Sequence, residues 1–148
     1  MVDQSAVGRT FTPVTARVES GRLRFFLDVL DERNPLFRDG SSAGYSATPV
    51  PPTYLFCLEM MDATEPFEFL TALGIDLAHV LHGEQRFSYH APVVVGETLT
   101  FMSRVTSVTD KKGGAMTLVV IKTEITNQSG VHVADTWRTI VVRNERSL

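Results

Sequence analysis

Three long strand-like runs in the second half of the chain most constrain what it can fold into. They cover residues 98–108, 116–125 and 131–142, and they are rich in β-branched side chains. Polar segments that contain glycine, at residues 110–114 and 127–130, separate them as hairpin loops would. The pattern predicts an antiparallel meander of three long strands.

An almost uniformly apolar segment, residues 53–62, precedes this meander, and residues 85–90 add a fourth expected strand. A helix that is apolar on every face is normally buried. A buried helix followed by long antiparallel strands favours a sheet wrapped around that helix, which is the hot-dog arrangement. We therefore expect an α+β protein of the hot-dog fold that dimerises through its sheet, although a generic α+β arrangement fits the same pattern.

The first half of the chain mixes helix, loop and one edge strand. Residues 11–18 suit a strand at a sheet edge, because Pro13 lacks the N–H group that a central strand needs. Ser20 is expected to cap a helix that runs to Leu30. Residues 66–73 suit one further short helix.

The length of 148 residues suits a single domain, which we place at residues 7–142, with tails at residues 1–6 and 143–148. A formal charge of −3 argues against a nucleic-acid partner. The chain has no apolar run long enough to span a membrane and no secretory signal at its start. We therefore expect a cytoplasmic protein, and its single cysteine, Cys57, excludes an internal disulfide.

Two motifs resemble a known family. Residues 31–39 read DERNPLFRD, and residues 82–92 read HGEQRFSYHAP, with VGETL after them at residues 95–99. The first motif, with a Pro-Val pair at residues 49–50, resembles the motif of the MaoC-like (R)-specific enoyl-CoA hydratases and dehydratases. The second resembles the signature of their N-terminal, FAS1-like dehydratase-domain branch. The resemblance covers residues 7–142 and implies the hot-dog fold, an acyl-thioester substrate on CoA or an acyl carrier protein, and no further cofactor.

The chain departs from the family motif at both proton-transferring positions. Family members add or remove water with an Asp and a His five positions apart, and here these positions hold Glu32 and Phe37. Phenylalanine cannot exchange a proton, so Glu32 is the remaining catalytic candidate. The resemblance further implies that Asn34, Phe37, Thr53 and Tyr54 contact the substrate. Backbone N–H groups of Thr53 and Tyr54 at a helix start could polarise the thioester carbonyl.

These departures imply a hydratase or dehydratase subunit that lacks the Asp/His pair and is inactive or weak alone. Some members of the family pair such a half, which binds and shapes the acyl chain, with a half that performs the chemistry. We therefore expect either a homodimer or a heterodimer with a catalytic MaoC-like subunit. A non-catalytic subunit that binds acyl ligands or serves assembly remains an alternative.

Glu59 on the apolar helix carries a different alternative. Hot-dog thioesterases use a carboxylate of this helix to attack or activate water, and a buried carboxylate has a raised pKa. The plainer interpretation, which we favour, points Glu59 to solvent at the wetter end of the helix. Glu32 and Asn34 are similarly ambiguous, because they also suit a helix end and the turn that follows it.

Three histidines, His79, His82 and His90, fall within twelve positions of one another, but their spacing matches no zinc signature. We interpret His82 and His90 as polar residues at strand ends, and His132 as incidental. The sequence therefore predicts no metal site.

Overall fold

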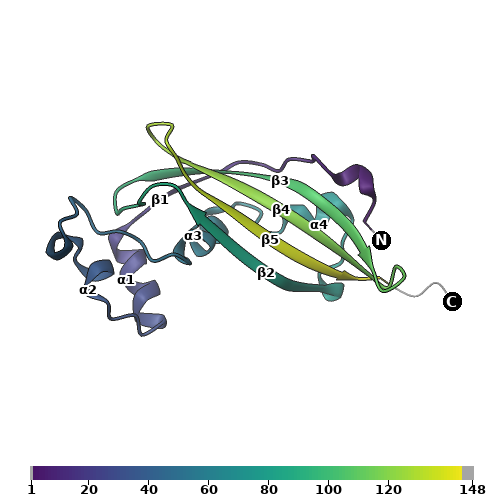
Figure 1. The fold of residues 1–148 in the computed structure, drawn as a ribbon, viewed down its shortest axis with the longest axis horizontal. Coiled ribbons are helices and arrows are strands. Elements are labelled where there is room, and N and C mark those ends of the chain that lie inside the picture. Colours follow the sequence, from purple (N-terminus) through teal and green to yellow (C-terminus); the bar gives the residue numbers. More distant parts are fainter. Residues whose placement is uncertain (1, 145–148) are drawn as a thin grey trace.

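The computed structural model describes residues 2–144 and contains one antiparallel sheet of five strands, in the order β1-β3-β4-β5-β2 (Figure 1). The strands are Val14–Arg17 (β1), Val80–Tyr89 (β2), Thr98–Lys111 (β3), Met116–Asn127 (β4) and His132–Arg143 (β5). The α-helices are Ser20–Val29 (α1), Pro35–Arg38 (α2), Tyr54–Asp62 (α3) and Glu68–Leu73 (α4). Short 3-10 turns cover Gln4–Ala6 (η1), Gly40–Ala43 (η2) and Leu77–His79 (η3).

The three strand-like runs form the expected antiparallel meander. β3 pairs with β4 and β4 with β5 along almost their whole lengths. β1, which follows Pro13, forms one edge of the sheet beside β3, and β2 forms the other edge beside β5. Register shifts in these pairings mark bulges, which bend strands and increase their twist. The sheet is correspondingly curled (Figure 1).

Helix α3 lies against one face of the sheet, which we call the inner face; the opposite face is the outer face. Leu55 and Leu58 of α3 are fully buried. They share a hydrophobic cluster, the first cluster, with Leu99 and Phe101 of β3 and Ile125 of β4. A sheet curled over a buried apolar helix confirms the α+β, hot-dog architecture.

A second hydrophobic cluster fills the other half of the inner face, beneath α4. It contains Phe69 of α4 together with Val105 of β3 and Ile121 of β4. Val2 is also buried there, although the sequence places residues 1–6 outside the domain. This packing is a long-range contact that no local pattern in the sequence reveals.

Several element boundaries differ from those expected. β2 begins at Val80, ahead of residues 85–90, because the long strand β5 continues to offer it a pairing partner. Glu19, rather than Ser20, occupies the capping position of α1, and its side chain makes no capping hydrogen bond. The last short helix begins at Glu68, two residues later than expected.

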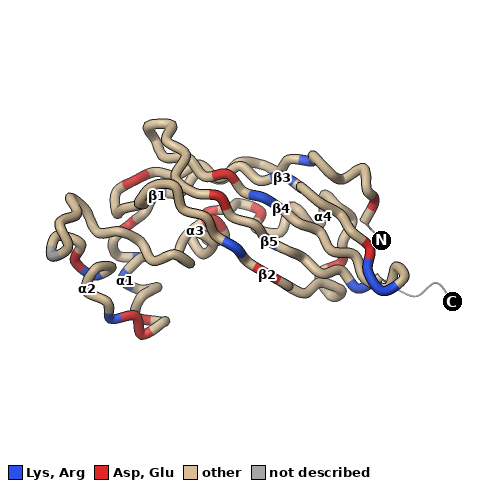
Figure 2. Tube along the Cα trace, in the orientation of Figure 1, with Lys and Arg blue, Asp and Glu red and all other residues tan. Residues whose placement is uncertain are grey.

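Helices α1 and α2 project beyond one end of the strands, so the motif of residues 31–39 lies outside the curl of the sheet (Figure 1). Acidic and basic residues are interspersed along the chain rather than gathered on one element (Figure 2). Among the described residues 2–144, no helix is long and apolar enough to cross a membrane.

Candidate functional site

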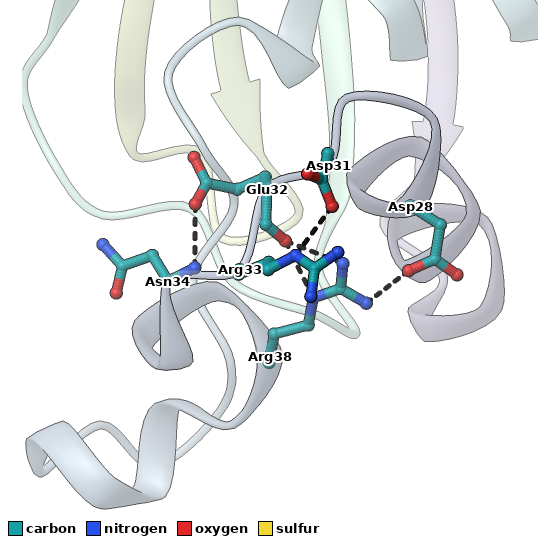
Figure 3. Close-up of polar contacts among 6 residues, drawn as sticks. All are labelled: Asp28, Asp31, Glu32, Arg33, Asn34 and Arg38. Carbon is teal, nitrogen blue, oxygen red and sulfur yellow. Dashed lines mark hydrogen bonds and ion pairs between the residues drawn. The ribbon is translucent and has the colours of Figure 1, made fainter.

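The motif between α1 and α2 is held together by its own polar contacts (Figure 3). The carboxylate of Glu32 accepts a hydrogen bond from the backbone N–H of Asn34 at 2.8 Å. The side-chain oxygen of Asn34 in turn accepts from the N–H of Leu36 at 3.0 Å and caps α2. Both side chains therefore perform the turn-forming roles that their local sequence allows.

Arg38 ties this loop to the end of α1. Its guanidinium donates to the backbone carbonyl of Glu32 at 3.0 and 2.7 Å and pairs with the carboxylate of Asp28 at 2.5 Å (Figure 3). Asp31, directly before Glu32, has a φ of 53°. This left-handed conformation favours glycine, and aspartate is among the few other residues that tolerate it.

Phe37, at the position of the motif histidine, is partly buried and packs against the first cluster. The four histidines of the sequence stand at positions 79, 82, 90 and 132, all in or beside β2 and β5. The loop between α1 and α2 therefore carries the carboxylates of Asp31 and Glu32 and no imidazole.

The start of α3 offers fewer free backbone N–H donors than the sequence predicted. Tyr54 is fully buried, and its backbone N–H donates to the carbonyl of Pro51 at 3.1 Å. Thr53 is exposed directly before the helix, so its N–H is the better placed of the two predicted donors. Tyr89, which the sequence analysis did not single out, donates its hydroxyl to the carbonyl of Pro52 and ties the end of β2 to this point.

Our interpretation of Glu59 as solvent-facing is wrong. Glu59 is only 8% exposed, because it lies on the side of α3 that faces the sheet. Its carboxylate pairs with the guanidinium of Arg138 on β5 at 3.1 Å and accepts from the hydroxyl of Ser103 on β3 at 3.3 Å. Because its partners lie 79 and 44 positions away along the chain, sequence spacing gave no sign of the contacts.

These contacts belong to a polar band that crosses the inner face between the two hydrophobic clusters. The band consists of Ser103, Thr123, Thr136 and Arg138, which lie on three neighbouring strands and face Glu59 or one another. Burial raises the pKa of Glu59, and this effect exceeds the opposing effects of the Arg138 charge and the hydroxyl groups. Glu59 is therefore a buried carboxyl group that holds its proton more tightly than an exposed one.

A pocket of about 680 Å³ opens beside this band, between α3, α4 and the segment that leads into β1. Glu59, Ser103 and Arg138 line it, together with Phe69. The guanidinium of Arg138 lies near two aromatic rings, and its buried Nε–H has no hydrogen-bond partner among the described residues. The pocket is thus lined by a carboxylate and by an arginine whose buried Nε–H is unsatisfied.

The histidines also depart in part from expectation. His90 directly follows β2, as predicted for a polar residue at a strand end. His82 lies inside β2 and stacks on Phe56 with ring centroids 5.5 Å apart. His132 is not incidental, because its Nε2 lies 3.2 Å from the carboxylate of Asp135.

Asp135 also accepts from His90 and Lys122. Burial raises the pKa of Asp135, but the hydrogen bonds from His90, Lys122 and His132 outweigh burial and bring that pKa below its usual value. Asp135 therefore stays ionised at neutral pH.

Comparisons with known proteins agree with this architecture. A UPF0336 protein of Streptomyces coelicolor is 34% identical over 147 residues, which cover 96% of this chain and 95% of that protein. One chain of the HadBC (3R-hydroxyacyl-ACP dehydratase) complex of Mycobacterium tuberculosis superposes with a TM-score of 0.76 at 23% identity, and the match covers 91% of this chain and 96% of that chain. A MaoC-like dehydratase superposes with a TM-score of 0.81 at 22% identity, covering 95% of this chain and 43% of its own.

The two structural likenesses, at under 25% identity, show that the fold is shared. The family described as FAS1-like, dehydratase domain region, matches residues 5–136, which is most of the sequence. This match and the 34% identity along nearly the whole chain show that the protein belongs to that family, the FAS1-like dehydratase domain region.

Proposed function

We propose that the chain is the acyl-thioester-binding subunit of a MaoC-like hydratase or dehydratase, and that a partner subunit supplies the Asp/His pair. The observation that carries the proposal is Phe37, a packed aromatic side chain where the reaction needs an imidazole. Glu32 retains a carboxylate, but it is one half of a pair. It remains the candidate for any weak proton transfer by the chain alone.

The substrate approaches, in this proposal, between the α1–α2 loop and the start of α3. Asn34 and Phe37 flank the loop side, and Thr53 presents an N–H to the thioester carbonyl. Tyr54 contributes its buried ring to the wall behind the helix start rather than a free donor. The acyl group and the pantetheine of CoA or of an acyl carrier protein are the only non-protein groups required.

The edge of the sheet supports the idea of a partner. β2 pairs with β5 on one side and with no strand of the described chain on the other. Unpaired edge strands are templates for pairing with another chain. HadBC is named as a complex. The other solved structure, a MaoC-like dehydratase, is a chain more than twice as long as the part matched here, as expected where one chain holds two such units.

Affinity purification from the protein's own cells tests this proposal. A tagged chain should retain, at equal stoichiometry, a second MaoC-like protein that has Asp and His five positions apart. Mass spectrometry identifies the partner, and sedimentation gives the stoichiometry. Recovery of a homodimer alone that hydrates crotonyl-CoA at the rate of a complete hydratase would contradict the proposal.

A second candidate function, acyl-thioester hydrolysis, is favoured by the position of Glu59 beside the pocket. A carboxylate whose pKa is raised can take a proton from water as the water adds to the thioester carbonyl, and it can return that proton to the thiolate as the thiolate leaves. If this function operates, Glu59→Gln should lower the kcat of acyl-CoA hydrolysis by about a hundredfold or more. A thiol-release assay measures the rate.

The matched control for Glu59→Gln is Glu124→Gln, an exposed carboxylate on β4 that faces away from the pocket. This variant should hydrolyse acyl-CoA at the wild-type rate. Hydrolysis that is absent from the wild-type chain, or that survives in Glu59→Gln, excludes Glu59 as the hydrolytic group and leaves the subunit proposal standing.

A further inference from the structure

Four side chains converge on the outer face of the sheet, away from α3 and the pocket. Ala134 and Thr136 of β5 face inward, so the alternation of the strand points Asp135, between them, to the outer face. Asp135 is nevertheless only 6% exposed. Three side chains contact it and shield it from solvent: Lys122 on β4, His132 at the start of β5, and His90 just after β2.

The contacts within this group are short and directed. His90 Nε2 lies 3.0 Å from Asp135 Oδ2, and His132 Nε2 lies 3.2 Å from Asp135 Oδ1. Lys122 Nζ lies 2.9 Å from the same Oδ1. The two imidazole rings are close, with centroids 4.5 Å apart. Both histidines therefore aim the same ring nitrogen at one carboxylate that already has a cationic partner.

From this geometry we propose that His90, His132 and Asp135 form a binding site for a divalent transition-metal ion, of which Zn²⁺ is the representative. One donor atom from each residue lies within 4.8 Å of the other two. Zn²⁺ holds nitrogen and oxygen ligands at about 2.0–2.2 Å, so its donors lie about 3–4 Å apart. The two imidazole nitrogens already lie 3.0 and 3.2 Å from oxygens of Asp135, which is within that spacing.

The donor set suits this class of ion. Two imidazoles and one carboxylate are ligands of Zn²⁺, Cu²⁺ and Ni²⁺, whereas Mg²⁺ and Ca²⁺ prefer oxygen donors alone. The His90 and His132 side chains are 40% and 42% exposed, so solvent can reach the ion and complete its coordination. The backbone holds His132 and Asp135 three residues apart on β5, and the pairing of β2 with β5 brings His90 to them.

Lys122 fits the site as a supporting residue. It bonds Oδ1 of Asp135, which leaves Oδ2 for the ion. A ligating carboxylate is commonly held by a hydrogen bond to its other oxygen, which fixes its orientation. The ammonium group also lies 5.6 Å from the centroid of the Trp137 ring.

Titration of the purified full-length chain with ZnCl₂ in a calorimeter tests the proposal. The wild-type chain should bind one ion saturably, and His90→Gln or His132→Gln should weaken binding by about tenfold or more. His82→Gln, a histidine of β2 that stacks on Phe56, is the matched control and should bind as the wild type does. Circular dichroism checks that each variant is folded.

Cobalt gives a second readout at the same site. Co²⁺ added in place of Zn²⁺ should show visible absorption typical of nitrogen and oxygen ligands, and each of the two histidine variants should lose it. The proposal is overturned if the wild-type chain binds no ion saturably, if both variants bind with wild-type affinity, or if His82→Gln loses affinity to the same extent.

Discussion

The purified chain, assayed alone, should hydrate crotonyl-CoA about a thousandfold more slowly than an (R)-specific hydratase with an intact Asp/His pair. General acid–base catalysis typically contributes a hundredfold to ten-thousandfold to a rate, and the chain lacks the imidazole half of that machinery at Phe37. The measurement is the loss of the enoyl-thioester absorbance at saturating substrate, with the complete hydratase under the same conditions as reference.

The same assay on the complex separates binding from chemistry. Once the partner is present, replacing the partner's Asp or His should abolish hydration, whereas Glu32→Gln in this chain should leave kcat largely unchanged. The carboxylate of Glu32 is engaged with the N–H of Asn34, as a turn-stabilising group is. If the chain alone hydrates crotonyl-CoA at a rate within tenfold of that of a complete hydratase, it is not a subunit that lacks the catalytic Asp/His pair.

Arg138→Met should lower the free energy of unfolding at pH 7 by about 3–5 kcal/mol, because it leaves the buried charge of Glu59 unpaired. Both side chains lie almost wholly out of solvent, so neither charge recovers its hydration. The total stability of a domain is about 5–15 kcal/mol, so the loss would be a large part of it. Urea denaturation followed by circular dichroism measures the change.

Two further variants make the cause specific. The double variant Glu59→Gln/Arg138→Met should be more stable than Arg138→Met, because removing the second charge removes the unpaired carboxylate. Arg104→Met, an exposed arginine on β3, should change stability by less than about 0.5 kcal/mol. Equal losses in the single and double variants would show that packing, not charge, is responsible.

Because the pKa of Glu59 is raised in the folded chain, its contribution to stability should fall as the pH rises. The folded chain binds this proton more tightly than the unfolded chain, in which the pKa is near 4.5. The Glu59 contribution to stability is therefore complete below that value and is lost as pH rises through the folded-state pKa. Relative to Glu59→Gln, the wild-type chain should lose stability as pH is raised from about 4 towards neutrality.

The sequence by itself determined the architecture, because local patterns carry it. The apolar segment before the strands could only be buried, and the polar breaks between the β-rich runs imposed hairpins. The identity of residue 37 is likewise a property of the chain alone, and no tertiary arrangement turns phenylalanine into an acid or a base. The fold, the family and the missing imidazole could therefore all be predicted from the sequence.

Only the tertiary structure decided which polar groups meet. Glu59 and Arg138 stand 79 positions apart, and His90 and Asp135 stand 45 apart. Strand register and the placement of α3 on the inner face bring each pair together. A shift of one residue in register would reverse the faces of β5, so pairings of this kind depend on long-range packing rather than on spacing in the sequence. The buried ion pair and the outer-face histidine cluster are therefore properties of the folded sheet, whereas the hot-dog fold is a property of the sequence pattern.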